Sequence, residues 1–224
     1  MRIRVGLENT IENGSVAWVL DHPGVTARGR DGSEALMRVP QALVAYQGWL
    51  AKHTQDSWLA DLGDFDVRMV ELLDRCVAKD APCNWFTDDQ RPLDPRELQQ
   101  GRQVLAWQRA NLLQMAGSFT PSELARVVEG EAFTLQSVLE GIAEAEQWLV
   151  EAAGLTGDAD QSADVFTQLK LVRDRLTRCL IDWPAEEAVR EREVEPWSAR
   201  KLLRRAIREE RERMEDLLRL MNYF

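Results

Sequence analysis

Residues 84–95 read NWFTDDQRPLDP and separate two parts of the chain that have different periodicity. The segment is polar and contains two prolines, which is typical of a connection between domains. Before it, apolar residues alternate with polar ones, as in strands; after it, they recur every three or four residues, as in helices. We therefore predict an α+β protein, with a small α/β domain at 1–83, a linker at 84–94 and a helical bundle at 95–224.

The beginning of the chain has the pattern of a β-hairpin. Residues 3–7 alternate between apolar and polar or small side chains, and Asn13-Gly14 is a strong turn dipeptide. The sequence SVAWVLD at 15–21 then predicts the second strand, and residues 25–27 predict a short third one.

A helix is predicted after these strands, because apolar residues recur at helical spacing from about 35 to 50. Pro40 lies inside this stretch and should kink the helix or split it in two. Residues 65–78 alternate loosely, and their pattern leaves open whether they form a strand or a helix.

The second part of the chain has the signals of four long helices and one short helix. We expect helices at about 95–117, 121–128, 134–153, 162–182 and 198–221. Asp94 and Thr120 each precede a proline and stand three residues before a glutamate, which is the pattern of a capped helix start. Helices of this length with short connections predict a bundle.

Composition restricts the class of protein. The chain has 224 residues, a formal net charge of −10 and 29% charged residues, and this acidic balance disfavours a general nucleic-acid-binding function. The spacing of Cys76, Cys83 and Cys179 is irregular and predicts reduced thiols. No signal peptide or membrane-spanning run is expected, because the apolar runs are short. We expect a soluble, cytoplasmic protein.

Two helix starts share a further pattern, FTLQSVL at 133–139 and WSARKLL at 197–203. Together with IAEAEQWL at 142–149, they resemble the DinB superfamily of four-helix bundles over about residues 93–224. Some members of that superfamily are metal-dependent thiol transferases or isomerases. The stretch CNWFTDDQRPLDPREL at 83–98 is similar to the connector in members with an added N-terminal domain. The resemblance implies a homodimer.

The N-terminal part has a resemblance of its own. The stretch AWVLDHPGVTARGRDGSEALMRV at 17–39 is similar to HicB-like antitoxin domains, which bind and inhibit a small RNA-cleaving toxin. The resemblance implies an N-terminal domain that binds a partner protein.

Three histidines typically hold the metal in the DinB superfamily. The resemblance places these ligands at Gly141, Glu209 and Arg213 of this chain, and none of them is histidine. Glycine has no ligating side chain, and arginine is a permanent cation that repels a metal ion. We therefore expect a degenerate site without metal or cofactor. Glu209 and Arg213 are four residues apart and should form an ion pair, with the arginine lying over the space at Gly141. Alternatively, Glu209 and Arg213 are ordinary surface charges.

Other residues that could carry chemistry have simpler interpretations. His22 precedes Pro23-Gly24 and is expected in a turn, and His53 is expected near a helix end. Cys179 is expected to pack in the core, and Trp148 in the core or a dimer interface. No catalytic residue is predicted.

The leading hypothesis is a non-catalytic protein that binds a small molecule or an unknown protein. One alternative is an enzyme, either a thiol-dependent transferase without metal or one whose metal is held by Glu140, Glu144 and Glu209. Another alternative is a regulatory module that binds its partner through the HicB-like domain. The sequence leaves the choice between enzyme and binding protein open.

Overall fold

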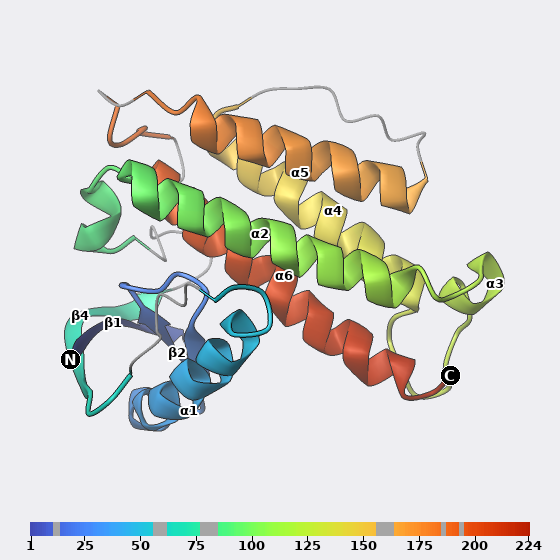
Figure 1. Cartoon of the computed structure of the whole chain (residues 1–224), viewed down its shortest axis with the longest axis horizontal. Coiled ribbons are helices and arrows are strands. Elements are labelled where there is room, and N and C mark those ends of the chain that lie inside the picture. Colours follow the sequence, from blue (N-terminus) through green and yellow to red (C-terminus); the bar gives the residue numbers. More distant parts are fainter. Residues whose placement is uncertain (11–13, 56–61, 77–84, 156–163, 185–186, 193–194) are drawn as a thin grey trace. The chain divides into compact units, whose positions relative to one another are not determined.

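The computed structural model describes residues 1–10, 14–55, 62–76, 85–155, 164–184, 187–192 and 195–224. The protein is α+β, as predicted, with a four-stranded sheet followed by helices (Figure 1). The chain divides into two compact units. The sheet unit comprises residues 1–92 and 191–201, and the helical unit comprises residues 93–190 and 202–224.

The predicted hairpin is confirmed. Strand β1 (Arg2–Thr10) pairs antiparallel with β2 (Gly14–Val19), and β3 (Thr26–Gly29) pairs antiparallel with the other side of β2. Residues 65–78 contribute strand β4 (Asp66–Cys76), which pairs parallel with β1. The sheet order is therefore β3-β2-β1-β4.

The hairpin turn depends on a glycine. Asn13 lies outside the described residues, but Gly14 beside it has a φ angle of 73°, in the left-handed region. A Cβ atom at Gly14 would also lie 2.4 Å from the backbone oxygen of Gly29. Both features favour glycine at this end of the turn.

Helix α1 (Gly32–Leu50) is continuous, so the prediction that Pro40 could split it is wrong. Its first turn is capped by Asp31, whose side chain accepts a hydrogen bond from the Glu34 backbone N–H. Pro40 lies on the exposed side, where the carbonyl oxygen that loses its helical partner can bind water instead. The buried side packs against strands β1, β2 and β3.

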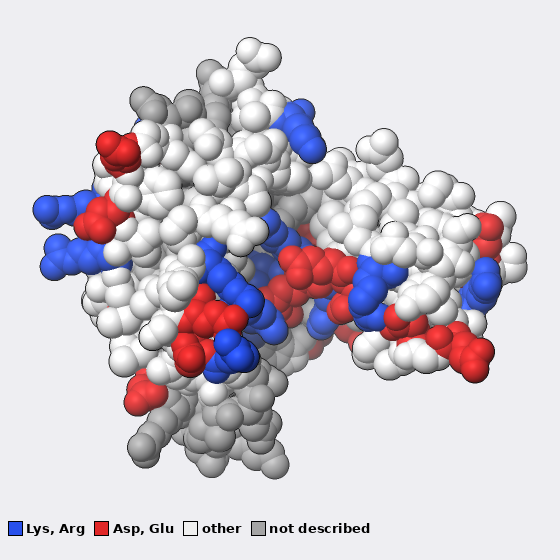
Figure 2. Space-filling model, turned by 90° about the horizontal axis from the view of Figure 1, so that it is seen from below, with Lys and Arg blue, Asp and Glu red and all other residues white. Residues whose placement is uncertain are grey.

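Acidic and basic side chains are interspersed on the face of the protein drawn in Figure 2. At the start of helix α1, Glu34 forms ion pairs with Arg30 at 3.0 Å and with Arg38 at 2.6 Å. Hydrogen bonds from the backbone N–H and the side chain of Arg30 hold the pKa of Glu34 below its ordinary value.

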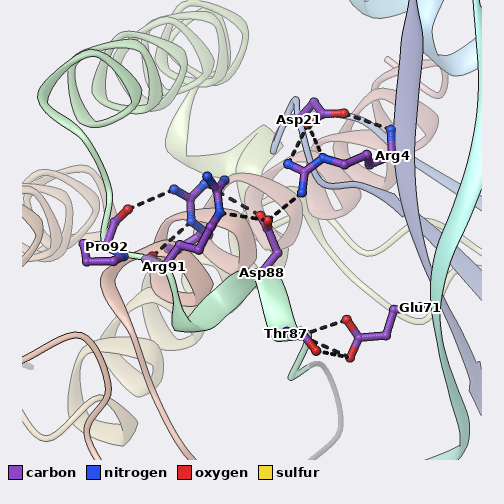
Figure 3. Close-up of polar contacts among 8 residues, drawn as sticks. Arg4, Asp21, Glu71, Thr87, Asp88, Arg91 and Pro92 are labelled. Carbon is purple, nitrogen blue, oxygen red and sulfur yellow. Dashed lines mark hydrogen bonds and ion pairs between the residues drawn. The ribbon is translucent and has the colours of Figure 1, made fainter.

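The segment predicted as a linker is built into the sheet unit over residues 85–92, which corrects the boundary expected at 84–94. Phe86 is fully buried, and a short 3₁₀ helix, η1 (Thr87–Gln90), follows it. Glu71 on β4 accepts a hydrogen bond of 2.8 Å from the backbone N–H of Thr87 (Figure 3). Because its polar side chains bond to the sheet unit, this segment is structural rather than a free connection.

Asp88 is the centre of a polar cluster that holds η1 in place (Figure 3). Its carboxylate accepts hydrogen bonds from Arg4 at 2.8 Å and from Arg91 at 3.0 Å. Arg4 also bonds to Asp21 at 2.8 Å. Burial acts to raise the pKa of Asp88, but the hydrogen bonds from Arg4 and Arg91 outweigh it and hold this pKa below its ordinary value.

Residues 191–201 also belong to the sheet unit, although the prediction placed them in the helical domain. Arg200 donates hydrogen bonds to the backbone oxygens of Arg91 at 3.2 Å and Pro92 at 3.0 Å. Lys201 is fully buried, and its ammonium group donates to Glu195 at 2.8 Å. These contacts join residues far apart in sequence, so local patterns do not reveal them.

We expect replacement of Asp88 by asparagine to destabilise the sheet unit mainly at neutral pH. A carboxylate whose pKa is lowered by folding contributes stability above its unfolded pKa, and this contribution is lost as pH falls through the folded pKa. The loss at pH 7 should be about 1 kcal/mol, because Arg4 and Arg91 are partly solvent-screened.

Hydrogen exchange of the β1 amides in increasing urea, at pH 7 and at pH 3, would measure the stability of the sheet unit in the variant and the wild type. Asp66→Asn is the matched control, since Asp66 is exposed and its side chain has no partner among the described residues. The carboxylate of Asp88 would not be the stabilising group if the variant and the wild type differed in free energy of unfolding by the same amount at both pH values.

The helical unit contains the remaining helices, except that residues 199–201 at the start of the last one belong to the sheet unit. These helices are α2 (Pro95–Ala116), α3 (Pro121–Leu124), α4 (Leu135–Ala152), α5 (Val165–Ile181) and α6 (Ala199–Met221). The four long helices are confirmed within three residues at each end. The predicted short helix ends early, at Leu124, and a turn that closes at Glu131 then leads toward α4. The capped starts at Asp94 and Thr120 are both present.

Each of the four long helices contributes to one apolar core. Leu112 of α2, Leu139 of α4, Leu169 of α5 and Leu217 of α6 are at most 1% exposed and belong to the same cluster of buried side chains. The long helices of the helical unit therefore surround a common interior (Figure 1).

Candidate functional site

The three positions singled out in the sequence, Gly141, Glu209 and Arg213, line one pocket of the helical unit. Its volume is about 290 Å³. The other lining residues are Glu144, Ala145, Trp148 and Arg205. All seven residues belong to α4 or α6, so the pocket lies between two helices of the same unit.

Helical periodicity explains why these residues share the pocket. The α4 residues stand at positions i, i+3, i+4 and i+7 from Gly141, which lie along one side of a helix. The α6 residues stand four positions apart, at 205, 209 and 213. Ile142 and Leu149 lie on the core side of α4 and are at most 1% exposed. One face of each helix therefore builds the core, and a neighbouring face builds the pocket.

Arg213 reaches from α6 to the backbone of α4. Its Nε atom donates a hydrogen bond of 3.0 Å to the carbonyl oxygen of Gly141. The space beside Gly141 is open enough for this approach, since a Cβ atom there would lie 4.0 Å from the Arg213 Nε atom. Within the described residues, the two terminal nitrogens of Arg213 have no hydrogen-bond or ion-pair partner. Four N–H donors of this guanidinium are therefore available to a ligand.

Glu209 does not pair with Arg213, so the predicted ion pair between them is wrong. Glu209 lies 3.9 Å from Arg205 instead, one helical turn toward the N-terminus of α6. The bond between Arg213 and Gly141 turns the arginine toward α4, away from the glutamate on its own helix. Because 3.9 Å exceeds an ordinary hydrogen-bond length, the Glu209 carboxylate keeps accepting capacity for a ligand.

Arg205 and Trp148 form the aromatic side of the pocket. The guanidinium carbon of Arg205 lies 5.0 Å from the centre of the Trp148 ring, which is within the range of a cation–π interaction. Trp148 is 49% exposed, so it contributes to a surface and not to the core that the sequence analysis considered for it.

The carboxylates proposed as alternative metal ligands do not gather into a metal site. In the part of the chain that the structure describes, no group of three His, Cys, Asp or Glu side chains could hold a metal ion. Glu140 instead accepts a hydrogen bond of 2.8 Å from Gln136 on its own helix. The guanidinium groups of Arg205 and Arg213 also line the pocket and would repel a divalent cation. The residues present therefore do not fit a transition metal.

A second polar centre lies in the interior, where sequence reasoning missed it. Arg109 of α2 bonds to Glu146 of α4 at 2.9 Å and to Glu210 of α6 at 2.7 Å. Arg173 of α5 bonds to Glu146 and lies 2.6 Å from Glu210. We call these four residues the buried charge cluster. Each long helix contributes one member, and none is more than 7% exposed.

The buried charge cluster has no net formal charge, because it contains two positive and two negative side chains. Burial acts to lower the pKa of Arg173, but the attraction of Glu146 and Glu210 outweighs it and raises this pKa above its ordinary value. Arg109 also donates to the backbone oxygen of Leu169, and Arg173 to that of Leu105 at 2.6 Å. Because its carboxylates are occupied by guanidinium groups, the cluster serves structure rather than ligand binding.

Among the residues that the structure describes, histidines and cysteines do not form a second candidate site. His22 lies in a turn, as predicted, and burial lowers its pKa. His53 follows α1 and lies against Trp49, with ring centres 4.7 Å apart. Cys179 is only half-buried, and burial raises the pKa of its thiol, which disfavours the nucleophilic thiolate. Cys83 lies outside the described residues.

No protein-family model, curated protein or solved structure matches the chain. Among the described residues, every helix is too short or too polar to cross a membrane. The candidate site therefore has to be interpreted from its own geometry.

Proposed function

We propose that the protein is a non-catalytic binding protein whose helical unit is a DinB-like bundle with a degenerate, metal-free site. The main support is the position of Arg213, whose Nε atom lies 3.0 Å from the carbonyl oxygen of Gly141. A permanent cation thus lies where the resemblance would require a metal ligand. The pocket lined by these residues is the binding site in this proposal.

The enzyme alternatives receive less support. Cys179 is a poor candidate for a catalytic thiol, because burial raises its pKa. The pocket contains Glu144 and Glu209, but the arginines beside them oppose metal binding. A homodimer in the cytoplasm, with a HicB-like N-terminal domain that binds a partner, remains a prediction.

Elemental analysis of the purified, untagged protein tests the proposal. The protein would be incubated separately with zinc, nickel and manganese salts and then dialysed. We expect far less than one metal ion per chain after dialysis, because two guanidinium groups line the pocket. Retention of about one ion per chain would overturn the proposal and support the alternative of a metal-dependent enzyme.

The matched variant restores the ligands that the resemblance expects, through Gly141→His, Glu209→His and Arg213→His together. Since all three positions line one pocket, this variant should retain zinc. Zinc retention would support the correspondence with the DinB ligand positions. Failure of a correctly folded variant to bind zinc would contradict that correspondence.

A further inference from the structure

The pocket between α4 and α6 is lined by charged side chains of both signs. Its lining includes the cations Arg205 and Arg213 and the anions Glu144 and Glu209. The formal charge of the pocket is therefore zero. We infer that this pocket binds a small zwitterion of the amino-acid class, with its carboxylate on Arg213 and its ammonium group between Glu209 and Glu144. This inference rests on the proposed binding function and specifies its ligand.

The cationic side is suited to a carboxylate. Arg213 uses its Nε atom to bond to Gly141, which fixes the guanidinium plane, while the two terminal nitrogens have no partner among the described residues. A guanidinium fork with free N–H groups binds a carboxylate through two parallel hydrogen bonds. Because the arginine is already held by the backbone of α4, binding would order fewer rotatable bonds.

The anionic side is suited to an ammonium group. Glu144 is exposed and has no hydrogen-bond or ion-pair partner among the described residues, and Glu209 has only the 3.9 Å contact with Arg205. Glu209 and Arg213 are one helical turn apart, so their side chains start about 5–6 Å from each other. A molecule with a carboxylate and an ammonium group a few bonds apart can reach both.

The balance of charges disfavours ligands of a single sign. Phosphate and other multiply charged anions would contact Glu144 and Glu209, and divalent cations or polyamines would contact Arg205 and Arg213. A zwitterion is attracted at both ends and adds no net charge. Electrostatic complementarity of this kind determines specificity more than total affinity.

The size and aromatic wall of the pocket limit the rest of the ligand. A volume of about 290 Å³ is at the small end of ligand pockets, which span about 300–1,000 Å³. A pocket of this size suits a small metabolite such as a free amino acid better than a larger ligand. The Trp148 side chain is 49% exposed and offers an apolar surface to the aliphatic or planar part of the ligand.

Ligand-detected saturation-transfer NMR on the full metal-free chain tests the inference. The probes are the free L-amino acids, acetate and methyl phosphate as anions, and ethylamine as a cation; each carries C–H protons that the experiment observes. We expect at least one amino acid to bind, and its N-acetyl and carboxamide derivatives to bind about tenfold more weakly or worse, because each lacks one charge.

Two variants locate the binding. Arg213→Met and Glu209→Gln should each weaken the best amino acid about tenfold or more, whereas Arg208→Met should not. Arg208 is the matched control, since it pairs with Glu212 at 2.6 Å on the same helix and does not line the pocket. Far-UV circular dichroism would verify that each variant is folded, and Glu209→Gln keeps the size of the side chain.

The other outcomes overturn the inference in distinct ways. Equal binding of acetate or methyl phosphate would make the pocket a simple anion site, and equal binding of ethylamine would make it a cation site. If no probe binds to the metal-free protein, the assigned ligand class is wrong. The proposed function fails by a different result, which is the retention of metal after dialysis.

Discussion

Replacement of Glu146 by alanine is expected to lower the free energy of unfolding of the helical unit by about 3–5 kcal/mol. Glu146 is 1% exposed and accepts hydrogen bonds from Arg109 of α2 and Arg173 of α5. Without it, Glu210 would be the only charge partner of two buried guanidinium groups within the described part of the chain. An uncompensated buried charge is far more costly than the loss of an exposed ion pair.

Urea unfolding followed by circular dichroism at 222 nm would measure this effect, because the helices dominate that signal. Glu144→Ala is the matched control, since Glu144 lies on the same helix, is exposed and has no partner among the described residues. Its effect should stay within about 0.5 kcal/mol. Equal effects of the two substitutions would show that the buried charge cluster is not formed in solution.

A joint apolar replacement separates the role of each charge from that of the whole cluster. In the variant Arg109→Met, Glu146→Leu, Arg173→Met, Glu210→Leu, no charge is left without a partner. We expect its stability to equal or exceed that of the wild type, because apolar groups of similar volume often replace buried ion pairs without loss. The Nε atom of Arg173 supports this expectation, since it is buried without a hydrogen-bond partner among the described residues. A strongly destabilised joint variant would mean that the cluster itself is a net source of stability.

Local signals explain which parts of the fold could be predicted from the sequence. The helix starts at Asp94 and Thr120 follow from capping patterns that need only a few neighbouring residues. The alternation in residues 3–7 and the Asn13-Gly14 dipeptide of the sequence likewise predict the hairpin, whose two strands pair in the structure. Pro40 does not split α1 as the prediction allowed, because it lies on the side of the helix that faces solvent.

Long-range pairing explains what the sequence did not reveal. Glu146 stands four residues after Ile142 and three before Leu149, so it occupies the buried face of α4. A charged residue at such a position was a usable signal, but its partners, Arg109 and Arg173, lie on two other helices. The three positions singled out in the sequence line one pocket, whereas the direction of Arg213 depends on its distance from α4, which no local pattern encodes.

Replacement of Phe86 by alanine is expected to destabilise the sheet unit by about 3–5 kcal/mol. Phe86 is fully buried and belongs to an apolar cluster with Val16, Trp18 and Leu20 of the sheet region. Gly6 on β1 leaves room for the ring, because a Cβ atom at Gly6 would lie 2.5 Å from the Phe86 Cε1 atom. Truncation would therefore leave a cavity against β1 that the backbone cannot fill by a small shift.

Hydrogen exchange of the amides in β1 and β2 would report this loss for the sheet unit alone. Phe133→Ala is the control of identical chemistry, since Phe133 is 54% exposed and should change stability by less than about 0.5 kcal/mol. Gly6→Ala should also destabilise the unit, because the added methyl group displaces the Phe86 ring. The two substitutions contact each other, so together they should cost less than the sum of their separate effects. Unchanged exchange in the Phe86→Ala variant would indicate that residues 85–92 are a linker, because a linker contributes no side chain to the core of the sheet unit.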